Sequence, residues 1–196
     1  MMRKLIIGLM WLVPLGLAHA QGEAGVNLLP MVLGKVATGP NGHATAYPLD
    51  ATYGVGLSVG YRFQAGVSVG LAPQVVFHLS AKDDGGYSVL DSQKEYDLMA
   101  RIAYTYSVVP KIDVYAEFLP GYAIVTYNQI VLGNKAYLAN GIVLGGGVGA
   151  AFALTDRFFA NASVGYQQGF QKASYIRVDD VQTKFVRLAI GGGVKF

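Results

Sequence analysis

Residues 53–63, with the sequence YGVGLSVGYRF, decide the fold. Every second residue in this stretch is apolar or aromatic, and these residues are Tyr53, Val55, Leu57, Val59, Tyr61 and Phe63. The residues between them are glycine, serine and Arg62. Because successive side chains of a β-strand point to opposite faces, the stretch is predicted to be a strand with one apolar face and one small or polar face.

The same alternation recurs along the chain. Eight segments carry it, at residues 26–37, 53–63, 67–79, 95–108, 112–124, 142–154, 160–167 and 185–196. Three short turns, at residues 64–66, 109–111 and 155–157, alternate with four longer polar connections, at residues 39–50, 80–92, 128–140 and 172–183. This order predicts antiparallel strands connected up and down, with short turns at one end and long loops at the other.

Two kinds of barrel fit this alternation. A soluble lipocalin-like barrel would point its apolar face inward, but the interior of an eight-stranded barrel is too narrow for so many bulky side chains. Charged residues make up only 14% of the chain, the mean hydropathy is +0.37, and no apolar run of about 18 residues follows the N-terminal segment. The sequence therefore predicts an all-β fold, an eight-stranded antiparallel up-and-down transmembrane β-barrel whose apolar face contacts lipid.

The N-terminal segment has the pattern of a secretory signal peptide. Arg3 and Lys4 precede an apolar stretch at residues 5–17, and Ala18-His19-Ala20 matches the small-x-small cleavage pattern. We therefore expect residues 1–20 to be cleaved and residues 21–196 to form one outer-membrane barrel domain. Without Arg3 and Lys4, 13 basic residues face 12 acidic ones, so the charge predicts no nucleic-acid partner. The chain contains no cysteine, which excludes disulfides and thiolate metal sites.

Three prolines interrupt the predicted strands. Pro30, Pro73 and Pro120 each remove a ladder donor and are expected at a bulge or a strand end. The inward and outward assignment can therefore shift by one residue beyond each of them.

The last strand carries a family resemblance. Residues 184–196 read KFVRLAIGGGVKF, and with the features above they resemble the OmpA transmembrane domain and its OmpX-like relatives. The resemblance implies a Gram-negative outer membrane, both termini in the periplasm, and contact with outer-membrane lipid and lipopolysaccharide. It also implies that the barrel assembly machinery reads the C-terminal pattern formed by Phe196, Val194, Ile190 and Leu188.

Few charged residues fall on the inward face of the predicted barrel, and they are Lys35, Arg62, Glu95, Asp97, Arg101, Asp113, Glu117, Arg187 and Lys195. Arg101 and Glu117 lie near the middle of neighbouring strands, where they can pair across the lumen. A buried charge needs a partner because its desolvation is costly. This favours a lumenal salt-bridge plug that includes Asp97 and Arg187, and the alternative is a gate of a narrow pore.

One weak arrangement could support catalysis. His78, Ser80 and Glu95 loosely resemble the His-x-Ser pair and nearby Glu of the lipid A deacylase barrels, but Ala81 replaces the Asn expected after the serine. The strand pattern also points His78 into the lumen, which favours a structural histidine. Asp83, Asp84 and Asp91 could hold calcium, although solvated loop carboxylates are commoner. No cofactor or metal site is expected.

Three functional hypotheses follow in order of preference. The first is a non-enzymatic outer-membrane barrel with a structural or surface-interaction role, whose extracellular ligand the sequence does not identify. The second is a narrow porin-like channel, and the third is a lipid A-modifying barrel enzyme.

Overall fold

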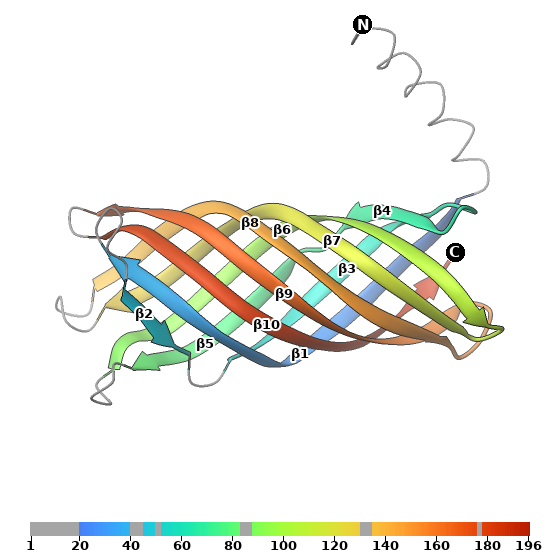
Figure 1. The fold of residues 1–196 in the computed structure, drawn as a ribbon, viewed down its shortest axis with the longest axis horizontal. Helices are drawn as coiled ribbons and strands as arrows, with labels where there is room; N and C mark the ends of the chain where they lie inside the picture. Colours follow the sequence, from blue (N-terminus) through green and yellow to red (C-terminus); the bar gives the residue numbers. More distant parts are fainter. Residues whose placement is uncertain (1–19, 40–44, 50–51, 83–87, 130–134, 176–177) are drawn as a thin grey trace, which may run out of the picture.

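The computed structural model describes residues 20–39, 45–49, 52–82, 88–129, 135–175 and 178–196, and these form one closed β-barrel (Figure 1). Residues 1–19 of the predicted signal peptide lie outside the described part, so the cleavage stays a prediction. Within the described ranges, no helix is long and apolar enough to cross a membrane.

In the described part of the chain, ten strands make up the barrel wall. They are β1 (Gln21–Gly39), β2 (Thr45–Pro48), β3 (Thr52–Arg62), β4 (Val67–Leu71), β5 (Gln74–Lys82), β6 (Ser88–Val109), β7 (Ile112–Gln129), β8 (Lys135–Ala153), β9 (Phe158–Tyr175) and β10 (Val178–Lys195). β2 and β3 pair with successive parts of β1 and share one position in the wall. β4 and β5 likewise share the position between β3 and β6. The wall is therefore the predicted ring of eight antiparallel strands, closed between β1 and β10.

The two ends of the barrel differ. Both termini of the barrel lie at the end that carries the short turns, where the Gly22 amide donates to the Phe196 carbonyl at 2.8 Å (Figure 1). The three short turns lie where the sequence predicted them. The prediction of four long loops was wrong in extent, because strands reach Gly39, Lys82, Gln129 and Tyr175 and resume only a few residues later. Among the described side chains of these extensions, Asn140, Lys172 and Gln182 lie on the outward parity and are polar, which weakens the lipid-facing pattern that identified the rest.

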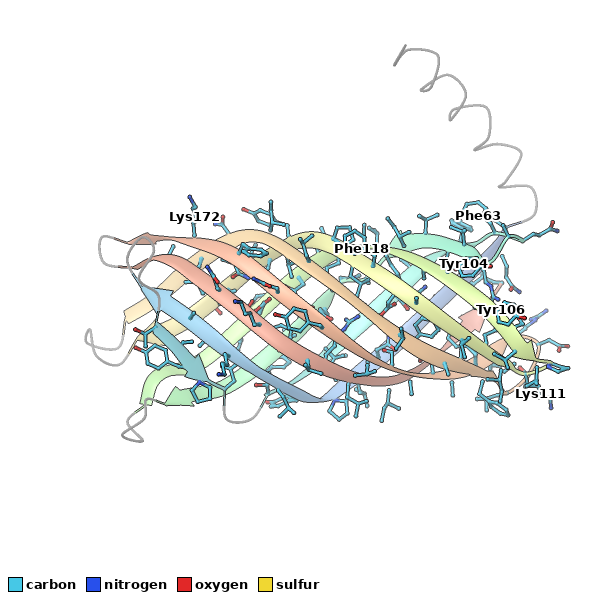
Figure 2. All side chains as sticks on the ribbon, viewed as in Figure 1. Phe63, Tyr104, Tyr106, Lys111, Phe118 and Lys172 are labelled. Atoms are coloured by element: carbon cyan, nitrogen blue, oxygen red, sulfur yellow. The ribbon has the colours of Figure 1, made fainter. Side chains whose placement is uncertain are left out.

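The apolar face points outward, as predicted. Most of the large apolar and aromatic residues on the predicted apolar face are exposed. Each of the eight strand positions in the ring carries some of them. Tyr104 and Tyr106 point outward near the end that carries the termini, and Phe118 lies outward further along the barrel (Figure 2). Aromatic side chains near the membrane interfaces and aliphatic ones between them are typical of a transmembrane barrel.

Pro30 shifts the inward and outward assignment of β1. The register with β10 moves by one residue between Leu28 and Met31, which marks a β-bulge. Beyond it Leu33 is 59% exposed and Val36 is 0% exposed. The prediction that Lys35 faces the lumen was therefore wrong, and Val36 takes an inward position instead.

The other two prolines leave the assignment unchanged. Pro73 lies in the gap between β4 and β5, and Leu71 stays outward while Gln74 stays inward. Phe118 and Tyr122, on either side of Pro120, both stay outward. A proline at these two places costs ladder hydrogen bonds but inserts no extra residue.

Candidate functional site

The middle of the lumen holds a buried polar cluster, built from inward positions of β5, β6, β9 and β10. The Nε2 groups of Gln74 and Gln167 both donate to Asp97 Oδ2, each at 2.7 Å. Gln74 Nε2 also donates to Gln167 Oε1 at 2.8 Å. Thr183 Oγ1 donates to Glu95 Oε1 at 3.2 Å. Two carboxyl groups are thus held in the lumen by neutral donors.

This cluster continues into an ion-pair network. Glu117 lies between two guanidinium groups, with Arg101 Nε at 2.9 Å from Oε2 and Arg187 Nη2 at 2.8 Å from Oε1. Arg187 Nη1 also donates to Gln74 Oε1 at 3.0 Å, which joins the ion pairs to the amide cluster. Arg101 lies over the Tyr115 ring, 5.4 Å from its centroid. Charge-assisted hydrogen bonds of this kind hold the network in one arrangement.

A second ion pair lies nearer the end that carries the termini. Arg62 Nη1 is 2.6 Å from Asp113 Oδ2 and 3.9 Å from Glu23 Oε1. Ser107 Oγ donates to Asp113 Oδ1 at 2.5 Å. These side chains are more exposed than Glu117 and Arg187, so solvent screens this pair more strongly.

The lumen is blocked at its loop end and across its middle. At the loop end, apolar side chains close it, and they are Val36, Leu49, Val125, Ala139, Ala173 and Val181. Between the two ion-pair regions a cavity of about 90 Å³ is left, lined in part by Arg62, Arg101 and Glu117. At about 10–15 Å³ per water molecule, it has room for roughly six to nine waters. This arrangement suits a closed, hydrogen-bonded plug.

The structure brings together Arg101, Glu117 and Arg187, and Gln74 links them to Asp97. Of the three catalytic candidates, Glu95 is the one whose side chain is within the described set. Glu95 is fully buried in the lumen, where it accepts hydrogen bonds from Thr183 and Gln167.

The other catalytic candidates and the calcium candidates lie partly or wholly outside the described residues. His78 and Ser80 pair through their backbones with Gln93 and Asp91 respectively, and their side chains lie outside the described set. Asp83 and Asp84, two of the calcium candidates, lie outside the described residues. Across the part of the chain that the structure describes, no group of three or more His, Cys, Asp or Glu residues is placed to hold a metal.

Sequence reasoning missed the neutral members of the network. Gln74 and Gln167 fall on the inward face of the predicted strands, and that position was the available signal. Neutral amides add nothing to the charge pattern, so their inward position alone indicates a place in the network. Gln171 and Thr183, which share a hydrogen bond of 3.3 Å, fell at the edge of a predicted loop.

A closed ring of eight antiparallel strands, apolar outside and filled with paired polar groups inside, defines a transmembrane β-barrel. Residues 12–196 match the family model described as the outer membrane protein beta-barrel domain. The chain belongs to this family, and its place is the outer membrane.

Solved structures with the same fold include several small outer-membrane proteins. Neisserial surface protein A (NspA) aligns with a TM-score of 0.58 and 16% identity, over 89% of this chain and 97% of its own. The outer membrane protein OprG of Pseudomonas aeruginosa gives 0.57 and 15%, over 90% and 95%. Ail, the attachment invasion locus protein of Yersinia pestis, gives 0.53 and 16%, over 91% and 99%. No curated protein sequence matches this chain.

Proposed function

We propose that this chain is a non-enzymatic outer-membrane barrel with a structural or surface-interaction role, exerted through the end of the barrel that carries the loops. The observation that carries the proposal is the filled lumen. Glu117 is bonded to two arginines, and an apolar cluster closes the loop end. A lumen filled in this way leaves the outer surface of the barrel as the part available to partners.

The extended strands support the same role. On β10 the outward residues are apolar from Phe196 back to Val186, a span of eleven residues, and about 9–11 residues are enough to cross a bilayer. The remainder of β10, residues 178–185, therefore extends past the hydrocarbon core of the membrane. A rigid wall that projects beyond the lipid offers a firm base for recognition by loops.

The proposed orientation places both termini and the short turns in the periplasm, with the loops outside. Barrels of the outer membrane generally have short periplasmic turns and longer extracellular loops. In this orientation Phe196, Val194, Ile190 and Leu188 end on the side from which the barrel assembly machinery would read them. NspA and Ail are named for a surface location and for attachment, and their shared fold makes a surface role the first to test.

Single cysteines test the orientation, because the natural chain has none. Thr45 lies exposed in β2 at the loop end, and Asp156 lies exposed in a short turn at the opposite end. A membrane-impermeant maleimide should label Thr45→Cys in intact cells and Asp156→Cys only after the outer membrane is permeabilised. Labelling of Asp156→Cys alone in intact cells would overturn the orientation.

Two assays test the role itself. The purified protein should give no discrete conductance steps in planar bilayers, because the lumen is filled. Reproducible steps would replace the proposal with the narrow channel. Incubation with lipopolysaccharide should release no acyl chains, and release that is lost in Ser80→Ala would replace it with the lipid A-modifying enzyme.

A further inference from the structure

The barrel wall itself marks the outer boundary of the membrane. Along β10 the outward residues are apolar up to Val186, and Lys184 is the first outward charged residue beyond them. The next residue on the outward parity beyond Lys184 is the polar Gln182. Outward apolar residues give way to polar ones where water replaces lipid outside. Lys184 therefore lies at the level of the lipid head groups.

β1 reaches the same boundary at Lys35. Leu33 is outward and exposed, Lys35 is the next outward residue, and Val36 is fully buried inside. This placement depends on the bulge at Pro30, which turns Lys35 from the lumen to the outer surface. Lys35 and Lys184 are direct partners in the register of β1 and β10. Directly opposite residues have Cβ atoms about 4.5–5.5 Å apart.

Two like charges thus stand side by side on the outer wall. Like charges directly opposite one another destabilise a sheet, and the neighbouring outward positions carry Leu33, Ala37 and Gln182, none of which is acidic. Among the described side chains, no carboxylate forms an ion pair with either lysine. By contrast, the outward Lys172 of β9, seen at the loop end in Figure 2, has Asp180 as its register partner.

We propose that Lys35 and Lys184 bind the phosphate group of a phosphorylated glycolipid in the outer leaflet. Each ammonium group offers three N–H donors, and lysine binds phosphate as a point charge. One phosphate between the two ammonium groups converts their mutual repulsion into two attractions. Long lysine stems lie along apolar surface and keep the charge at the head-group level. The inference rests on the proposed orientation, which places the lysine pair in the outer leaflet.

The test compares lipid binding by matched charge variants in detergent micelles. Native mass spectrometry counts bound bisphosphorylated lipid A on the wild type, on Lys35→Ala/Lys184→Ala, and on the control Lys94→Ala/Lys111→Ala. The control removes the same charge from two other exposed lysines, which lie on β6 and in a short turn. A lysine near an anionic membrane surface contributes about a fivefold factor, so the paired variant should bind about twenty-five-fold more weakly.

The outcomes separate the site from its alternatives. The control should bind as the wild type does, and dephosphorylated lipid A should bind the wild type as weakly as the paired variant binds the phosphorylated form. Equal loss in both double variants would overturn the site in favour of nonspecific charge. Displacement of lipid A by sucrose octasulfate at equal concentration would overturn it in favour of a soluble polyanion. The cysteine labelling measures the orientation independently of lipid binding. The proposed orientation and the proposed phosphate site can therefore fail separately.

Discussion

Glu117→Gln is the sharpest test of the lumenal network, because Glu117 is the carboxylate shared by Arg101 and Arg187. The substitution keeps the size of the side chain and removes its charge. It leaves two guanidinium groups in a narrow lumen with no ionic partner at this position. The loss of folding free energy should therefore come from stranded charges more than from lost packing.

The burial of the three side chains sets the magnitude. The Glu117 and Arg187 side chains are each 8% exposed, and removal of one partner from a buried pair costs about 3–5 kcal/mol. The Arg101 side chain is 21% exposed, so its contribution is closer to that of a surface pair, about 1 kcal/mol or less. The glutamine still accepts hydrogen bonds, which places the expected loss near the lower value, about 3 kcal/mol.

Urea unfolding of the refolded protein in lipid vesicles measures this loss, with heat-modifiable migration on gels as a second readout of the folded barrel. With a denaturant slope of about 1–3 kcal/mol per molar urea, the midpoint should fall by about 1–3 M. Arg187→Gln and the double variant complete a thermodynamic cycle with Glu117→Gln. A coupling energy within about 0.5 kcal/mol of zero would refute the reasoning, because residues in one network couple more strongly than that.

Three further predictions concern the end of the barrel that carries the termini. Asp113→Asn should lower the free energy of unfolding by only about 1 kcal/mol in the same assay, because the Asp113 side chain is 18% exposed. Gly66→Ala should cost about 1–2 kcal/mol, since Gly66 has a φ of 82° and a Cβ there would overlap the Thr105 carbonyl oxygen. Phe196→Ala should lower the amount of assembled barrel in cells severalfold on quantitative immunoblots. The purified variant should unfold near the wild-type midpoint, because the Phe196 side chain is exposed and its backbone bonds to Gly22 persist.

The sequence predicted the barrel because lipid imposes a strict alternation on every residue that it touches. Runs such as residues 53–61 and 96–108 keep that alternation without a break, and their outward residues are exposed as expected. Beyond the membrane the outer face of the wall contacts water, so polar residues are favoured on the outward positions there. Val181 is buried inside the barrel and the next residue, Gln182, lies on the outward parity, and this part of the strand was interpreted as loop.

The sequence predicted which charged residues lie in the lumen, but it did not predict all of the contacts between them. Arg101 and Glu117 lie on neighbouring strands, so parity and strand order are enough to bring them near each other. Arg187 reaches Glu117 from β10, across the barrel, and this contact depends on how strand tilt staggers the wall. Tilt and stagger follow from closure of the whole ring, which no single segment encodes.

A single extra residue decides what the outer wall presents to lipid. Alternation has a period of two, so one inserted residue exchanges the faces of everything that follows it in a strand. At Pro30 the exchange turns Val36 into the apolar seal of the lumen and Lys35 outward beside Lys184. Without the bulge, a lysine would enter the apolar cluster and a valine would stand at the head-group level. The bulge therefore serves the closed lumen and the charged rim at once, which is why neither could be derived from the pattern of β1 alone.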